Sequence, residues 1–463
     1  MPLRVCLIVD NPLRDIDGLV LVARNLALNG VQAYLVPMYN QDFDVIAIKP
    51  DLVLVNYARP NNIEQLWRFH AAGIRIGILD TEGSPAMDLD DFARNVKNVK
   101  CSDFIDLYCL WGSEQYDAFL KQKVTSKEKL HLTGCPRYDY CANPWTKALP
   151  QPAIEKNYIL INTRFPAINP RFTSGPEEER ATMVKAGFNA EWVDSYIHDS
   201  QIAYDNLIVS LERLSNRFPE QQFVIRPHPF ENPQAYKQLS KLNNIQIRQE
   251  GTSVEWINSA KMVIHQNCLT AIEAVMLGCE PISLEWFNTP ALSEIGPRSV
   301  SQLANSQEEL ESLVSMILSG SIPAASSELT TARNNIIHAR YYANDGKSAQ
   351  RVANIISRVI ANSNKLQRRK MPRFEIKPTV MHVARMIFGY KLFHYLKRSV
   401  QGSKNDMRLA AKLFNLEQVQ SILDRINNVS NKNEAVSVCY AANDDLVYSR
   451  YASGQVVKVW KSI

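Results

Sequence analysis

The feature that most constrains the fold is an alternation of short apolar runs with longer amphipathic stretches, which occurs twice along the chain. The first series of apolar runs covers residues 4–9, 33–38, 51–56, 75–80, 107–112 and 129–134. The second series covers residues 158–162, 222–226, 244–248, 261–265 and 280–285. Short apolar runs separated by helical patterns are typical of parallel β-sheets covered by helices. The sequence therefore predicts two doubly wound α/β domains facing a cleft.

The chain of 463 residues is long enough for two cores and an appendage. Residues 141–157 carry three prolines and no periodicity, which is typical of a linker. The prediction therefore places an N-terminal domain at residues 1–140, the linker at 141–157 and a second domain at 158–360. Residues 361–463 are expected to form a basic, largely helical extension that ends in a small β-hairpin.

Several classes of protein are not expected. The first apolar run, Val5 to Val9, is too short for a signal peptide, and no run approaches the roughly 20 residues of a membrane span. The eight cysteines form no CxxC pair and no metal-type spacing with histidine. We expect reduced thiols in a cytoplasmic protein, without a metal or another cofactor.

The charge is concentrated near the C-terminus. Residues 365–404 contain eleven Lys or Arg and one acid, about +10, whereas the whole chain carries +5. Cations mixed with apolar side chains would bind an anionic membrane surface, or they would belong to a helical appendage that packs on the body with its charges solvated. No nucleic-acid-binding motif accompanies this block, so no nucleic acid is expected.

The stretch "FVIRPHPFENP" (223–233) places Arg226 and His228 where a strand of the second domain ends. Pro227 and Pro229 stiffen this turn, and an Arg beside a His suits an oxyanion such as phosphate. The alternative is an exposed turn with a chance histidine. Ligands of doubly wound sheets bind beyond the carboxyl ends of the strands, which favours the binding role.

A second strand of this domain ends at His265 and leads through a polar turn into a helix. Asn267 or Thr270 is expected to cap that helix, whose backbone N–H groups would face a phosphate. Glu273 is either the far half of a capping box or a carboxylate for ribose hydroxyls. A third strand ends in Asn162 and Thr163 before Arg164, which adds positive charge at the same edge or belongs to an ordinary loop.

The first domain offers carboxylates at a strand end. The stretch "GILDTEGSPAMD" (77–88) presents Asp80 and Glu82 before a glycine, and a carboxylate facing a phosphate site suits a general base. The alternative role for Asp80 is to cap the helix after residue 88. Arg14 and Asp15 follow the first strand and are candidates for contact with an acceptor.

The chain resembles the GT-B glycosyltransferases of bacterial surface polysaccharide assembly. The resemblance rests on "PLRDIDGLVLVARNL", "LDTEG", "LWGSEQYDAFL", "LTGCPRYD", "INTRFPAIN", "RPHP", "NCLTAIEAVMLGCEPIS" and "NDGKSAQRVANII", in this order over residues 1 to about 360. It is similar in particular to sialyltransferases and Kdo transferases, which carry an acidic pair before glycine and a His-Pro. The matching residues are Asp80, Glu82 and His228, although Thr81 separates the two acids.

The resemblance implies a metal-independent transfer of a sugar from a nucleotide sugar, such as CMP-linked Kdo, to a glycan or glycolipid acceptor. Glu82 would be the catalytic carboxylate, assisted by Asp80. His228 would bind the donor phosphate and help the nucleotide to leave, near the inner face of the cytoplasmic membrane. The alternatives are a polyol-phosphate transferase of the CDP-glycerol type with His265 as a base, a UDP-sugar epimerase, or a non-catalytic scaffold.

Overall fold

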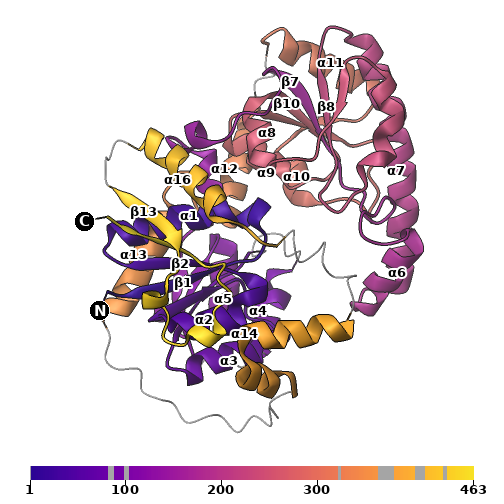
Figure 1. The fold of residues 1–463 in the computed structure, drawn as a ribbon. Coiled ribbons are helices and arrows are strands. Elements are labelled where there is room, and N and C mark those ends of the chain that lie inside the picture. Colours follow the sequence, from indigo (N-terminus) through magenta and orange to yellow (C-terminus); the bar gives the residue numbers. More distant parts are fainter. Residues whose placement is uncertain are drawn as a thin grey trace. The chain divides into compact units, whose positions relative to one another are not determined.

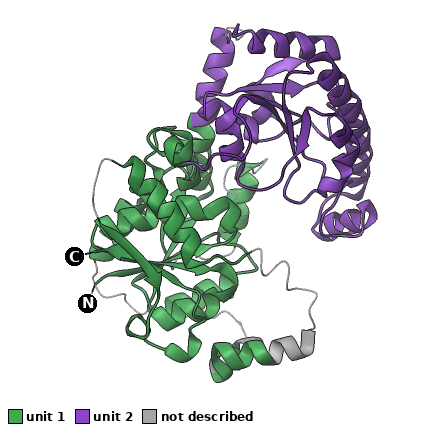
Figure 2. Ribbon diagram, turned by 45° about the horizontal axis from the view of Figure 1, so that its top comes forward, with its two compact units in different colours: residues 1–148, 338–463 green, residues 149–337 purple. Residues whose placement is uncertain are grey.

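A computed structural model describes residues 2–81, 88–98, 104–321, 325–362, 380–401, 412–430 and 435–462. The chain divides into two compact units, shown by Figure 1 as a ribbon and by Figure 2 in two colours. Unit 1 combines residues 1–148 with residues 338–463, and unit 2 comprises residues 149–337. The boundary at residue 148 falls inside the expected linker.

The sheet of unit 1 has the strand order β13-β14-β2-β1-β3-β4-β5-β6. Strands β1 to β6 are parallel, whereas β14 is antiparallel to both β2 and β13. The strands are β1 (Arg4–Val9), β2 (Gln32–Pro37), β3 (Leu52–Val55), β4 (Arg75–Leu79), β5 (Ile105–Leu110), β6 (Leu130–Leu132), β13 (Val436–Tyr440) and β14 (Val457–Lys461). The parallel strands are buried almost throughout, because helices cover both faces of such a sheet.

The helices of unit 1 include α1 (Pro12–Leu28), α2 (Gln41–Ile48), α3 (Ile63–Ala71), α4 (Leu89–Asn98), α5 (Ser113–Gln122), α13 (Ser348–Ala361), α14 (Val380–Gln401) and α16 (Leu416–Val429). Short 3₁₀ turns include η1 (Met38–Asn40), η2 (Lys127–Lys129), η3 (Pro136–Cys141), η4 (Trp145–Ala148), η7 (Asn443–Asp445) and η8 (Ser449–Tyr451). Helix α1 begins five residues before its expected start at residue 17. The Asn11 side chain accepts from the Leu13 N–H and Pro12 occupies the first turn, which together start the helix there.

The sheet of unit 2 is parallel, with the strand order β12-β11-β10-β7-β8-β9. Its strands are β7 (Tyr158–Asn162), β8 (Phe223–Arg226), β9 (Ile245–Ile247), β10 (Ala260–His265), β11 (Glu280–Leu284) and β12 (Gln302–Ala304). Its helices include α6 (Pro176–Lys185), α7 (Ala190–Arg217), η5 (Pro233–Lys241), α8 (Ser253–Ser259), α9 (Thr270–Met276), α10 (Ile295–Ser299) and α11 (Gln307–Leu318), and α12 (Ser327–Tyr341) follows. The edge strand β12 is only three residues long, and the sequence did not predict it.

The C-terminal part of the chain differs from the expected boundaries at residues 360 and 361. Helix α13 packs on α1 and η3 of unit 1, and the Asp139 carboxylate of η3 accepts from the backbone N–H groups of Ser348 and Ala349 at 2.8 and 2.7 Å. The expected β-hairpin is present as β13 and β14, and it extends the unit 1 sheet at β2. The end of the chain is therefore part of unit 1 and not a separate helical extension.

The expected basic block lies partly outside the described residues. Helix α14 covers residues 380–401 and is interrupted at Gly389, which has a φ of 67°. Among the helices that the structure describes, none is both long and apolar enough to cross a bilayer.

Candidate functional site

The strand order of unit 2 reverses between β7 and β10. The chain runs outward from β7 through β8 to β9, and then returns to β10 on the other side of β7. Such a reversal opens a crevice beyond the carboxyl ends of the two strands, where doubly wound folds bind their ligands. The register places Asn162 of β7 beside both His265 of β10 and Arg226 of β8.

Asn162 has an unsatisfied polar atom at this end of the sheet. Its side chain is buried, and its Nδ2 donates to Thr270 Oγ1 at 2.8 Å, which spans the reversal from β7 to α9. Its Oδ1 is also buried and accepts no hydrogen bond from any described residue. An unsatisfied buried acceptor costs about 1–3 kcal/mol, so a hydroxyl donor from a ligand would be stabilised there.

His228 lies in the turn after β8 with its ring partly exposed. Its Nδ1 accepts the Phe230 N–H at 3.2 Å, which leaves the proton of the neutral ring on Nε2. Burial, and then the positive charge of Arg164, lower the pKa of His228 to about 4. At neutral pH the ring is therefore a neutral hydrogen-bond donor, and not an imidazolium acid.

Arg164 joins the loops that follow β7 and β10. Its Nη1 donates to the Asn267 carbonyl at 3.1 Å and pairs with Glu294 at 2.8 Å. The side chain retains 38% exposure, so it can also face a ligand. Burial lowers the pKa of Arg164, but the neighbouring groups, led by Glu294, together raise it overall, so the positive charge persists beside His228.

Arg226 is buried and donates to the carbonyls of Glu250 and Gly251, both at 2.6 Å. These bonds fix the turn after β9 against the end of β8. The sequence placed Arg226 correctly at the strand end, and its observed contacts are structural. Its predicted contact with the donor stays a prediction.

The loop after β10 differs from the expected helix cap. The N-cap of α9 is Leu269, without a side-chain cap, so neither Asn267 nor Thr270 caps this helix. Asn267 adopts a left-handed φ of 53°, and its side chain donates to Asn288 Oδ1 at 2.7 Å. Because Thr270 is not the N-cap, Glu273 does not complete a capping box with it, and Glu273 accepts from Ser253 Oγ at 2.6 Å. A contact of Glu273 with ribose stays a prediction.

His265 is fully buried, and both ring nitrogens are in use. Its Nδ1 accepts the Cys268 N–H at 3.3 Å. Ser301 Oγ donates to the Pro297 carbonyl at 2.7 Å, so it accepts from His265 Nε2 at 2.8 Å. Burial lowers the pKa of His265 to about 4. The ring is a structural link and is not placed to act as a base.

Glu231 was not singled out from the sequence. It is fully buried, accepts from Thr163 Oγ1 and Tyr236 Oη at 2.8 Å each, and also accepts from the Phe165 N–H. Its own N–H donates to the His228 carbonyl at 2.8 Å. Glu231 thus fixes the loop that carries His228 to the loop that carries Arg164. An acid two residues after the stiff Pro-His-Pro turn was the available signal.

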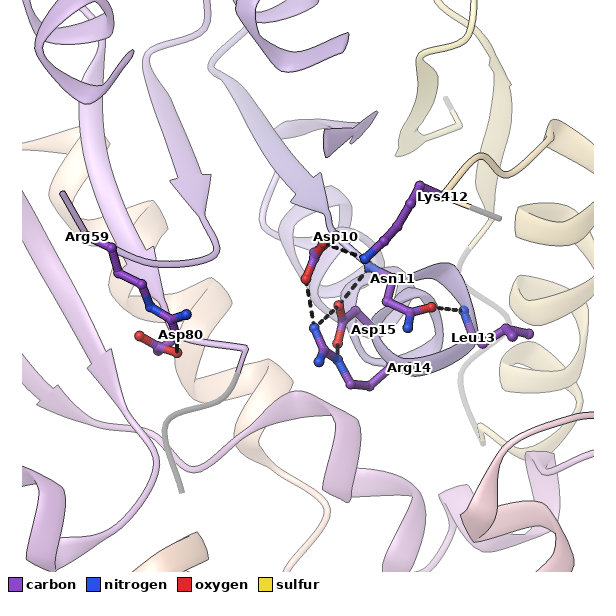
Figure 3. Close-up of polar contacts among 8 residues, drawn as sticks. All are labelled: Asp10, Asn11, Leu13, Arg14, Asp15, Arg59, Asp80 and Lys412. Atoms are coloured by element: carbon purple, nitrogen blue, oxygen red, sulfur yellow. Dashed lines mark hydrogen bonds and ion pairs between the residues drawn. The ribbon is translucent and has the colours of Figure 1, made fainter. Parts of the chain in front are cut away.

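In unit 1 a polar network surrounds the end of β1 (Figure 3). Arg14 pairs with Asp10 at 2.9 Å and with Asp15 at 2.8 Å, and Lys412 also pairs with Asp10 at 2.9 Å. Asp15 accepts the Asn11 N–H at 3.0 Å. Arg14 and Asp15 therefore bind each other and the strand end, and their predicted role toward an acceptor stays a prediction.

Asp80 follows β4 and is buried, with its Oδ1 3.7 Å from Arg59 Nη2 (Figure 3). It lines a cavity of about 30 Å³ together with Asp15, Asn56 and Arg137, which has room for water but not for a sugar. The alternative role of Asp80 as a helix cap is wrong, because Asp88 accepts the Asp91 N–H at the start of α4. Glu82 lies outside the described residues.

Metal ligands were not expected. Over the described ranges, no group of three or more His, Cys, Asp or Glu side chains is arranged to hold a metal ion. The described cysteines are unpaired thiols, and most are buried in the cores of the two units.

No protein-family model and no curated protein matches the chain. A proposed UDP-N-acetylglucosamine 2-epimerase from Listeria monocytogenes superposes with a TM-score of 0.50 at 10% identity, over 79% of this chain and 98% of that one. The wall teichoic acid polymerase TagF gives 0.48 at 10% identity over 78% and 88% of the two chains. A UDP-GlcNAc 2-epimerase from Neisseria meningitidis gives 0.46 at 13% identity over 78% and 100%. The first likeness shows the fold alone, which is α/β and GT-B-like as predicted.

Proposed function

We propose that the protein is a metal-independent glycosyltransferase that binds a nucleotide sugar in the crevice between β7 and β10 and transfers its sugar to a surface glycan or a lipid-linked glycan. The observation that supports this proposal is the set of polar groups that gather at the carboxyl ends of these strands. Asn162 offers a buried acceptor without a partner among the described residues, and His228 offers a neutral donor. Arg164 holds a positive charge beside His228.

The reaction needs a stabilised leaving group. The acceptor oxygen forms a bond to the anomeric carbon while the bond from that carbon to the phosphate oxygen breaks, and the electron pair stays on the phosphate. The Nε2–H of His228 and the guanidinium of Arg164 are suited to bind this developing charge. One such donor typically contributes ~3 kcal/mol in the transition state, so His228→Ala should slow transfer on the order of 100-fold or more.

The acceptor hydroxyl must also lose its proton. The resemblance to sialyltransferases and Kdo transferases assigns this role to Glu82, next to Gly83 and two residues from Asp80. Asp80 is buried beside Arg59, which favours a supporting role for it in positioning the turn. Within this proposal Glu82 takes the proton, and the donor is a CMP-activated acidic sugar such as Kdo.

A UDP-sugar epimerase is the second candidate. The observation that favours it is the fold likeness to the Listeria protein, the one comparison named above whose TM-score reaches 0.5. A polyol-phosphate transferase with His265 as its base is less well supported, since both nitrogens of that ring are engaged in the fold. A non-catalytic scaffold would leave the crevice without a nucleotide.

Thermal stabilisation of the purified protein by CMP, CDP or UDP distinguishes these functions. A nucleotide at 100 times its Kd adds about 2.7 kcal/mol to the free energy of unfolding. We expect CMP to stabilise the protein, His228→Ala to weaken the effect, and His198→Ala to leave it unchanged, because His198 is exposed on α7. Stabilisation by UDP alone would favour the epimerase, and by CDP alone the polyol-phosphate transferase. No stabilisation of a folded protein by any of them would overturn nucleotide binding.

A second measurement tests the base. Release of free CMP from a CMP-sugar should fall on the order of 100-fold or more in Glu82→Gln, while CMP still stabilises that variant. Unchanged turnover in Glu82→Gln would refute the role of this carboxylate.

A further inference from the structure

Unit 1 contains a second pocket, which the proposed function does not use. It has a volume of about 540 Å³ and is bounded by α2, α3, α14 and η8. Figure 1 shows helices α2, α3 and α14 close to one another in unit 1. A pocket of this size is within the range that holds small ligands.

The lining of this pocket is rich in positive charge. It includes Lys49, Arg68, Arg385 and Arg450, against the single carboxylate of Asp42. Asp42 already pairs with Arg68 and, at 2.7 Å, with Arg385. Four cations against one acid leave an excess of positive charge in the lining. Glu64 lies outside the lining, 3.7 Å from Arg68, and reduces this excess only in part.

Two of these cations are exposed to solvent, where an anion can approach them. Lys49 is exposed at the end of α2 and forms no ion pair with a described residue. Arg450 is also exposed, and its guanidinium carbon lies 4.7 Å from the centre of the Tyr451 ring. Its Nη2 donates to Tyr451 Oη, and the guanidinium keeps its positive charge in this contact. The remaining walls are largely apolar, with Phe43 and Phe69 among them.

Helix α14 presents an apolar surface next to this pocket. Phe393 is buried 5.5 Å from Phe43, so this side of the helix packs on unit 1. The large side chains of Ile387 and Phe388 are 65% and 42% exposed. Arg385 and Phe388 are three residues apart in one helical segment, which makes them neighbours on the helix surface. Among the side chains of α14 that the structure describes, the large exposed apolar ones are Ile387, Phe388, Leu392 and Tyr395.

We propose that the pocket and the exposed side of α14 form a membrane-docking site, in which the cations bind the phosphate headgroup of an anionic phospholipid and the apolar side chains of α14 enter the interfacial layer. Charge complementarity selects an anionic bilayer as the occupant. A soluble anion would account for the cations but not for the exposed apolar side chains beside them. This inference does not rest on the proposed function, because docking requires no nucleotide.

Flotation of the full chain with vesicles tests this site. We expect binding to phosphatidylglycerol vesicles that weakens as salt is added, and little binding to phosphatidylcholine vesicles. One Lys or Arg near an anionic surface raises binding about fivefold, so Lys49→Gln with Arg450→Gln should lower it roughly 30-fold. Leu392→Ser tests the apolar contribution and should also weaken binding, since this exposed side chain is not needed for the fold.

Lys123→Gln is a matched control. Lys49 and Lys123 are both exposed and end their helices in the left-handed conformation, with φ of 51° and 54°. Lys123 lies outside the pocket lining, so its loss should change vesicle binding less than twofold, well below the roughly fivefold effect of one docking cation. Equal binding to both kinds of vesicle, or no loss in the double variant, would overturn the proposal. Stabilisation by inorganic phosphate that depends on Lys49, without any vesicle binding, would also overturn it and indicate a soluble anion.

Discussion

Glu231 offers a sharp test of how the candidate site is held together. Its carboxylate accepts three hydrogen bonds from buried groups, two from hydroxyls and one from the Phe165 N–H. The hydroxyls can rotate, whereas the peptide N–H cannot. Replacements that preserve or remove the acceptor for this N–H should therefore differ in their effect.

Glu231→Gln can keep the amide oxygen on the Phe165 N–H, and its NH₂ can donate to the hydroxyls of Thr163 and Tyr236. Burial raises the pKa of Glu231, so the loss of its charge removes an unfavourable contribution as well as charge-assisted bonds. We expect a cost below about 1.5 kcal/mol. Glu231→Ala leaves the N–H and both hydroxyls without this acceptor and opens a cavity, and should cost about 3–5 kcal/mol.

Amide hydrogen exchange of the β7 and β8 peptides reports the free energy of opening of this part of unit 2 without a contribution from unit 1. Glu220→Ala, at an exposed position before β8, is the control and should change it by less than about 0.5 kcal/mol. If Glu231→Ala and Glu231→Gln cost the same, or if the alanine variant loses less than about 1 kcal/mol, the argued role of this carboxylate is refuted.

Three further predictions concern particular contacts. A Cβ on Gly112 would lie 2.0 Å from the Ala339 carbonyl oxygen, so Gly112→Ala should lower the free energy of unfolding by about 3 kcal/mol or more. Gly296→Ala is the control, because a Cβ there meets no close neighbour, and it should have little effect on the melting temperature. Asp139→Ala removes the acceptor for two N–H groups of α13 and should cost about 2–3 kcal/mol, seen as faster hydrogen exchange at the start of that helix. Folding lowers the pKa of His265 from 6.5 to about 4. Between these two pH values the unfolded chain binds a proton at His265 and the folded chain does not, so stability is lost as the pH falls from 6.5 to 4. His265→Gln should remove about 3 kcal/mol of that loss, which urea midpoints at pH 7 and pH 4 would measure. If the variant loses as much stability on acidification as the parent protein, the neutral buried ring is contradicted.

The sequence predicted the parallel sheets and the edge at which polar groups gather. Strand runs alternating with helices specify parallel strands, and parallel strands bring their carboxyl ends to one edge. The separate stretches that contain Asn162, His228 and His265 therefore meet at one end of the unit 2 sheet, as the strand register shows. Local pattern and topology were sufficient for this part of the prediction.

The return of the chain to unit 1 could not be read from local pattern. Helix α12 itself runs across the boundary at residue 337, and the attachment of α13 depends on two backbone N–H groups that meet Asp139, more than 200 residues away. The pairing of β14 with β2 likewise joins the two ends of the chain. Such contacts are decided by tertiary geometry, which periodicity does not encode.

Residue type and position at a strand end also did not distinguish the roles of Arg226, His265 and Asn162, which lie in register across three central strands. What distinguishes them is where their polar atoms are satisfied. Arg226 donates to two carbonyls of the fold, and His265 uses both nitrogens within it. Asn162 retains a buried oxygen that meets no donor among the described residues. A buried acceptor without a hydrogen bond destabilises the fold, and among these three residues only Asn162 has one that a ligand could satisfy. Nucleotide binding should therefore depend on Asn162 more than on Arg226 or His265.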